Sequence, residues 1–103
     1  MEPIQRRVSS DLEPIMPRYL ANRKSDIERL RAALASNMLE DIRALGHTMK
    51  GSGTSFGIED ISTFGRAIEQ AAKAADTEAL RHLIEEFASF IEHLEIIFVD
   101  EST

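Results

Sequence analysis

The chain has 103 residues, 43% of them hydrophobic, and a net charge of −6 at pH 7 with a sequence pI of about 5.0. This length suits one domain with a modest core, and no apolar run approaches the roughly 20 residues that a membrane-spanning helix needs. The acidic balance argues against nucleic acid as a partner, and the absence of cysteine excludes disulfides and thiolate metal sites. Because the N-terminus also lacks the apolar stretch of a secretory signal, we expect a cytoplasmic protein that binds a soluble protein or a small ligand.

The N-terminal segment predicts a loose arm followed by a short helix. Residues 1–10 are polar and aperiodic, which is typical of a flexible arm. Asp11 is a candidate cap of the first helix. Pro14 and Pro17 are tolerated only in a first turn, so this helix is predicted to be short or bent. Its apolar side consists of Ile15, Met16, Tyr19 and Leu20. Residues 22–25 form either a joint or part of one continuous helix, after which the helical stripe continues with Ile27, Leu30 and Leu34.

The central segment predicts a second helix that begins after a break at Ser36 and Asn37. Asn37 is followed three residues later by Glu40, the spacing of a capping box. Gly57 is a natural C-terminal stop. The apolar side of this helix consists of Ile42, Leu45, Met49 and Phe56.

Two further helices complete the predicted fold. The third covers about residues 59–75, and its inward-facing residues are Ile61, Phe64, Ile68, Ala71 and Ala72. Asp76 and Thr77 provide the turn and the cap of the last helix, whose stripe consists of Leu80, Ile84, Phe87, Ile91, Leu94 and Phe98. Because no segment alternates as a strand does and the connections are short, we predict an all-α fold, an antiparallel up-and-down four-helix bundle with a short N-terminal helix. The helical domain is expected over residues 11–99, with a tail at 100–103.

One histidine in the second helix is predicted to face solvent. At about 100° per residue, His47 lies roughly 140° from Ile42 and roughly 160° from Met49, which form the apolar side. The residues that share its exposed strip are Arg43, Lys50, Gly51 and Thr54. A lone exposed histidine is usually an ordinary surface residue. A nucleophilic imidazole beside a cation and a patch without side chains is instead suited to carry a phosphoryl group.

Three glycines in the same helix favour close approach of other groups. Gly46, Gly51 and Gly53 lie where each is less favourable than alanine by about 1 kcal/mol. Glycine is favoured at these positions if another helix or a partner protein must approach the helix backbone closely. We expect a neighbouring helix on the Gly53 side and a partner surface on the Gly51 side.

The run His-Thr-Met-Lys-Gly-Ser at residues 47–52, with Gly57 ten residues after the histidine, resembles the histidine-containing phosphotransfer (HPt) domains of His–Asp phosphorelays. From about Asp11 to Phe98, the helix order, the short turns and the acidic helical surface are also similar to that family. One departure is Gly46, directly before the histidine, where the family commonly has a larger residue.

The resemblance implies a role for each residue of the motif. His47 accepts a phosphoryl group from the aspartyl-phosphate of a receiver domain and passes it to another receiver. Lys50 helps to balance the charge of the phosphate, and Gly51 leaves room for the receiver. The expected partners are therefore receiver domains of response regulators and of hybrid histidine kinases.

The chemistry of the residues fits this role independently. A neutral imidazole is a competent nucleophile near neutral pH, and an acyl phosphate is already reactive. Arg43 and Lys50 can supply part of the positive charge that the transferring group needs. The remainder, including Mg²⁺, is expected from the receiver. This chain is expected to bind no cofactor and no metal, since His82 and His93 lie about three helical turns apart, too far for one ion.

Docking is predicted to use the exposed strip together with the N-terminal helix. Arg43 and Thr54 belong to the strip, and Ile15, Met16 and Tyr19 are the candidate apolar contacts of the helix. We expect a monomer, with a dimer as the alternative if one edge of the wide apolar stripe of the last helix is exposed.

Two other functions compete with a phosphorelay carrier. The first is a helical binding module that sequesters a receiver or another signalling protein without carrying phosphate. The second is an enzyme, such as the phosphoacceptor part of a histidine kinase or a phosphohistidine-dependent transferase. Against the kinase, 103 residues leave no room for an ATP-binding domain, and His47 is not followed by the acidic residue, arginine and proline of a kinase dimerisation helix.

Overall fold

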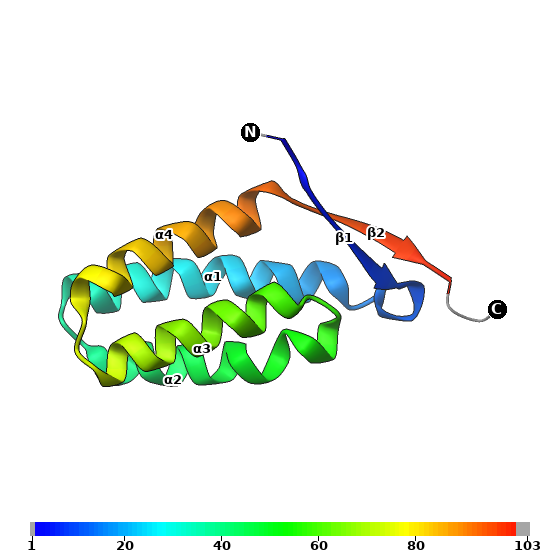
Figure 1. Ribbon diagram of the computed structural model, residues 1–103. Coiled ribbons are helices and arrows are strands. Elements are labelled where there is room, and N and C mark those ends of the chain that lie inside the picture. Colours follow the sequence, from blue (N-terminus) through cyan, green and yellow to red (C-terminus); the bar gives the residue numbers. More distant parts are fainter. Residues whose placement is uncertain (1, 101–103) are drawn as a thin grey trace.

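The computed structural model describes residues 2–100 as a bundle of four helices with a small parallel sheet (Figure 1). The helices are α1 (Met16–Ala35), α2 (Leu39–Ser52), α3 (Glu59–Lys73) and α4 (Thr77–His93). The strands are β1 (Ile4–Ser9) and β2 (Leu94–Val99), and single 3₁₀ turns occupy Ser10–Leu12 and Thr54–Phe56. The prediction of four helices is confirmed, whereas the prediction of an all-α fold is wrong for the two strands.

The first helix is not short, and in this respect the prediction is wrong. α1 runs unbroken for 20 residues and is longer than any of the other three helices. Pro14 precedes it and Pro17 lies in its first turn, where an N–H has no partner within the helix in any case. The proposed joint is helical, and Arg23 and Asp26 pair across it with 2.9 Å between Nε and Oδ2. Asp11 lies in the preceding 3₁₀ turn and does not cap α1.

The predicted loose arm over residues 1–10 is wrong for Ile4–Ser9, which form β1. β1 pairs in parallel with β2, with Ile4 opposite Leu94 and Ser9 opposite Val99.

The predicted end of the last helix is wrong as well, because α4 stops at His93 and the following residues form the extended strand β2. The run of β2 is rich in β-branched and aromatic residues, which favour a strand. A bidentate bond from Arg6 to Asp60, at 2.8 and 3.0 Å, ties β1 to α3.

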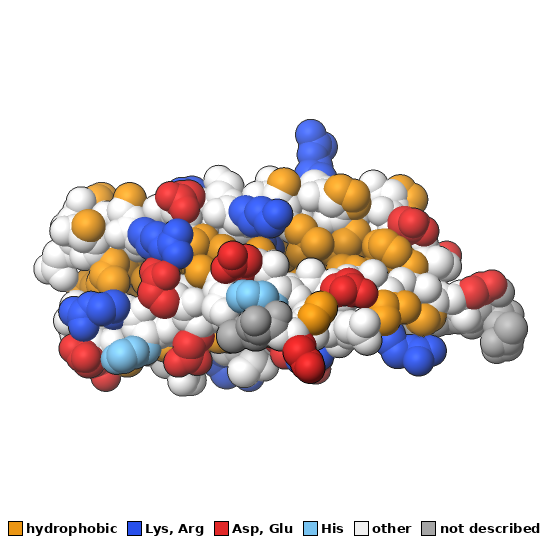
Figure 2. Space-filling view, turned by 90° about the horizontal axis from the view of Figure 1, so that it is seen from above, with side chains coloured by type: hydrophobic (Ala, Val, Ile, Leu, Met, Phe, Trp, Pro, Cys, Tyr) orange, Lys and Arg blue, Asp and Glu red, His pale blue; other side chains and the backbone are white. Residues whose placement is uncertain are grey.

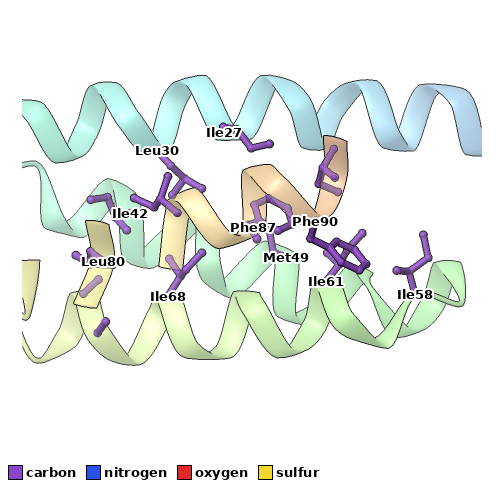
Figure 3. Close-up of a cluster of buried hydrophobic side chains, with 14 of the residues drawn as sticks. Ile27, Leu30, Ile42, Met49, Ile58, Ile61, Ile68, Leu80, Phe87 and Phe90 are labelled. Carbon is purple, nitrogen blue, oxygen red and sulfur yellow. The ribbon is translucent and has the colours of Figure 1, made fainter. Parts of the chain in front are cut away.

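The core lies between the four helices, where apolar side chains point toward one another (Figure 3). Each helix contributes fully buried residues, such as Leu30, Ile42, Ile61 and Phe87. The helical stripes predicted from the sequence supply most of these residues, although Phe56, Leu94 and Phe98 lie outside the helices predicted to contain them. α2 and α3 share the most extensive interface between helices.

The turns between helices follow the predictions in part. Asp76 caps α4, since its carboxylate accepts a bond of 3.0 Å from the backbone N–H of Ala79. Gly57 has a left-handed φ of 79° and closes the 3₁₀ turn that follows α2. The predicted capping box at Asn37 is wrong, because Met38 precedes α2 and Asn37 itself adopts a left-handed φ of 56° in the turn.

The surface carries charges of both signs. On the face seen in Figure 2, acidic and basic side chains are interspersed, with hydrophobic side chains visible between them. Within residues 2–100, the large hydrophobic side chains that are exposed lie on three separate segments and are Ile15, Met38 and Ile97. No helix within residues 2–100 combines the length and the apolar character needed to cross a membrane.

Candidate functional site

The outer face of α2 presents His47 to solvent, as the angular spacing predicts. The side chain of His47 is 64% exposed, whereas Met49 on the opposite side of the helix is fully buried. α2 packs its apolar side on the core, so its polar side faces outward. The imidazole is therefore accessible to a partner.

A buried carboxylate lies directly beside this histidine. Glu69, on α3, has a side chain that is only 5% exposed, and its Oε2 lies 2.9 Å from Nδ1 of His47. Its Oε1 accepts a bond of 2.7 Å from Nζ of Lys50. An ionised carboxylate can only accept, so Nδ1 of the neutral ring must carry the proton. The lone pair of that ring is then on Nε2, the nitrogen that does not face Glu69.

The surroundings of Glu69 keep it ionised. Its pKa is lowered from 4.5 to about 2, chiefly by the hydrogen bond from Lys50. Burial acts in the opposite direction, while the hydrogen bond from His47 and the charges of Lys50 and Lys73 lower the pKa further. The carboxylate is thus a permanent negative charge beside the imidazole at neutral pH.

This lowered pKa predicts a specific dependence of stability on pH. A folded-state pKa below the unfolded value of 4.5 adds stability that is complete above that value and is lost as the pH falls toward about 2. We expect the difference in unfolding free energy between the wild type and Glu69→Gln, measured in urea, to shrink over this window. The other carboxylates are present in both proteins, so their contributions cancel in the difference between the two unfolding free energies. A difference that stays constant from neutral pH to about pH 2 would contradict the lowered pKa.

Two glycines bring α3 close enough for Glu69 to reach α2. A Cβ atom on Gly46 would lie 2.8 Å from the backbone N of Glu69 and 2.9 Å from the carbonyl oxygen of Gly65. A Cβ on Gly65 would lie 2.7 Å from the carbonyl oxygen of Gly46 and would also overlap the backbone N of Lys50. Neither helix backbone could approach this closely with alanine at these positions. Gly46, the departure from the HPt pattern, therefore serves helix packing.

The other predicted strip residues differ in their surroundings. Gly51 is exposed, and a Cβ built on it would have no atom within 4 Å. Arg43 is half-buried, bonds to Glu40 at 2.6–3.0 Å and lies 4.0 Å from Glu69. Thr54 is exposed and lies in the 3₁₀ turn that directly follows α2, where its hydroxyl bonds to Glu59 at 3.0 Å.

Two of the three apolar docking residues predicted on the first helix are wrong. Met16 and Tyr19 are 2% and 5% exposed and belong to the core. The ring of Tyr19 stacks on Phe56 with 3.9 Å between centroids, and its hydroxyl lies 3.0 Å from Oγ of Ser52. The uninterrupted α1 turns this side inward against the end of α2. Ile15, just before α1, is 48% exposed and remains available.

The sequence interpretation missed Glu69, although the pattern holds a signal for it. Glu69 follows Gly65 by four residues and precedes Ala72 by three, so all three share the inward face of α3. An acidic residue on an inward face needs a partner. The partners of Glu69, His47 and Lys50, lie on the neighbouring helix α2. The spacing of residues within α3 cannot identify them.

Three cations surround the buried carboxylate and form a positive rim beside the imidazole. Besides Lys50 and Arg43, Nζ of Lys73 lies 4.0 Å from Oε2 of Glu69. Such a rim can stabilise an anionic group attached to the ring. Among the residues that the structure describes, no three His, Asp or Glu side chains are grouped to hold a metal ion.

Comparison with known proteins identifies one family. The family model described as Hpt domain matches residues 16–96, from the first residue of α1 into β2. The matched range includes His47, Lys50, Gly51 and Glu69. No curated protein and no solved structure gives a significant match.

Proposed function

This chain belongs to the Hpt domain family, whose members are phosphotransfer carriers in His–Asp signalling, and we propose that His47 is its phosphoacceptor. One observation carries this proposal. His47 is the exposed histidine of α2, and Glu69 holds its Nδ1 at 2.9 Å. The Nε2 lone pair is thereby left for attack on a phosphoryl group.

The transfer step follows from this arrangement. Nε2 of His47 attacks the phosphorus of an aspartyl-phosphate on a receiver domain and forms the N–P bond. The P–O bond breaks, and its electron pair returns to the aspartate carboxylate. The Nδ1 proton stays directed at Glu69 throughout. The reverse reaction with a second receiver passes the phosphoryl group on.

Neighbouring residues support the charge and the approach of the partner. Lys50 balances part of the phosphoryl charge, with Arg43 as a second cation on the same face of α2. Gly51 leaves an open patch for the receiver surface, and Ile15 is an exposed apolar residue for docking. Mg²⁺ on the receiver supplies further charge to the transferring group. We expect the chain to act as a monomer in the cytoplasm.

A direct experiment tests the proposal. The chain is mixed with a radiolabelled, phosphorylated receiver domain, and the label on each protein is followed at short times. Label should move to this chain in an acid-labile, base-stable form and leave it when a second, unlabelled receiver is added. Absence of label from the wild type would overturn the proposal. Tight binding without label would instead favour a sequestering module.

The open patch at Gly51 leads to a further prediction. In Gly51→Leu we expect transfer from a receiver to slow by about tenfold, because the new side chain stands where the partner must approach. Labelling of His47 by phosphoramidate, a small donor, should stay near the wild-type rate. Leucine is the better helix former by about 1 kcal/mol, so the fold should not weaken. Gly51→Ala should show a smaller loss, and an unchanged rate in Gly51→Leu would argue against docking at this patch.

A further inference from the structure

The three cations around Glu69 are not equivalent. Nζ of Lys50 lies within hydrogen-bond distance of the carboxylate, at 2.7 Å. Lys73 and Arg43 both lie 4.0 Å from Oε2, just outside that distance. In this state Lys50 is therefore hydrogen-bonded to Glu69, and Lys73 and Arg43 are two further cations close to the same carboxylate.

Phosphorylation of His47 would create a conflict at this site. Lys50 must turn toward the phosphoryl group to balance its charge, and that movement removes the closest cation from Glu69. The Glu69 side chain is only 5% exposed, so it is poorly solvated and depends on its protein partners. Removing one partner from a buried ion pair is strongly unfavourable. Lys50 would therefore be released to the phosphoryl group more readily if another cation moved closer to Glu69.

Lys73 is better suited to this exchange than Arg43. Arg43 is already bonded to Glu40 at 2.6–3.0 Å, so a move toward Glu69 would break that ion pair. Within residues 2–100, Lys73 has no ion pair other than its long contact with Glu69. Its side chain is 59% exposed and therefore free to move. It also follows Glu69 by four residues on α3, the favourable order for a helical ion pair.

We propose that Lys73 replaces Lys50 as the partner of Glu69 when His47 carries a phosphoryl group. Lys73 is then a positioning residue that acts through Glu69 and does not touch the phosphoryl group. The inference rests on the proposed function, since it requires that His47 is phosphorylated. The charged groups involved are Lys50 with Arg43 on α2, and Glu69 with Lys73 on α3.

The test measures how fast phosphoramidate phosphorylates the intact chain, with ³¹P spectra to assign the phosphohistidine. Lys73→Gln should slow phosphorylation of His47 by about threefold, the size of a partly exposed ion-pair effect, and Lys73→Arg should restore the rate. Lys24→Gln is the matched control, because the same charge is removed from α1 in the groove beside α4. In a Glu69→Gln background, the further change Lys73→Gln should have no effect.

The outcomes separate this inference from the function on which it rests. A wild type that phosphoramidate never labels at His47 overturns both. A labelled wild type in which Lys73→Gln matches Lys24→Gln overturns the exchange alone. A slowing by Lys73→Gln that persists in the Glu69→Gln background also overturns it, because Lys73 would then act on the phosphoryl donor directly.

Discussion

Replacement of His47 by glutamine is expected to reduce phosphoryl transfer to this chain to background. The glutamine amide can still donate a hydrogen bond to Glu69, so the surroundings of the site are kept. An amide nitrogen has no nucleophilic lone pair, and the N–P bond cannot form. Because His47 is 64% exposed, the unfolding free energy should change by no more than about 0.5 kcal/mol. The measurement is transfer of label from a phosphorylated receiver, together with urea unfolding.

His82 provides a matched control for that experiment. It is also an exposed histidine near a carboxylate, with 3.5 Å between its Nε2 and Oε1 of Glu78, but it lies on α4. His82→Gln should take up label at the wild-type rate. Label that persists in His47→Gln would refute the assignment of the phosphoacceptor. His47→Gln can bind the receiver as tightly as the wild type under either function. Labelling of the wild type is what distinguishes a phosphoryl carrier from a sequestering module.

The second large effect is expected from a single methyl group at Gly65. Gly65→Ala should lower the unfolding free energy by about 2–3 kcal/mol, the upper part of the range for overpacking a well-packed core. The added Cβ would overlap the backbone N of Lys50 and lie 2.7 Å from the carbonyl oxygen of Gly46. These backbone atoms cannot move without separating α2 from α3. At about 4–8 °C per kcal/mol for a domain of this size, the thermal midpoint should fall by about 8–24 °C.

Gly51→Ala is the control for this substitution and should have the opposite sign. The same methyl group meets no atom within 4 Å there, so only the higher helix propensity of alanine remains, worth about 1 kcal/mol. Gly65→Ala should also slow labelling of His47 at temperatures where the protein is folded, because Glu69 moves away with α3. Equal stability of the two variants would contradict the packing role of Gly65.

Helical periodicity predicted the parts of this fold that depend on one helix at a time. The inward positions of Leu30, Ile42 and Phe87 follow from spacing alone, and so does the exposure of His47. The end of α4 could not be found this way. Leu94 and Phe98 continue the helical spacing of the stripe, yet the residues between them also suit a strand, and only pairing with β1 decides between the two.

The site was predicted less completely than the fold because its geometry depends on contacts between helices. The sequence predicts that Gly53 faces a neighbouring helix, and a Cβ on it would lie 2.9 Å from the carbonyl oxygen of Ile58 and overlap Ser62 of α3. The contact of Glu69 with His47 depends on the close approach of α2 to α3 at Gly46. Spacing along either helix contains no information on that approach.

The parallel pairing of β1 with β2 has a consequence for the order in which the molecule folds. Gln5 donates a hydrogen bond of 3.3 Å to Glu95, a residue 90 positions further along the chain. Joining segments so distant carries a large loop-closure entropy, whereas successive helices meet after short turns. A two-stranded sheet is also marginally stable by itself. We therefore expect the helices to assemble first and the strands to pair last, and the strands to open first when the native protein fluctuates.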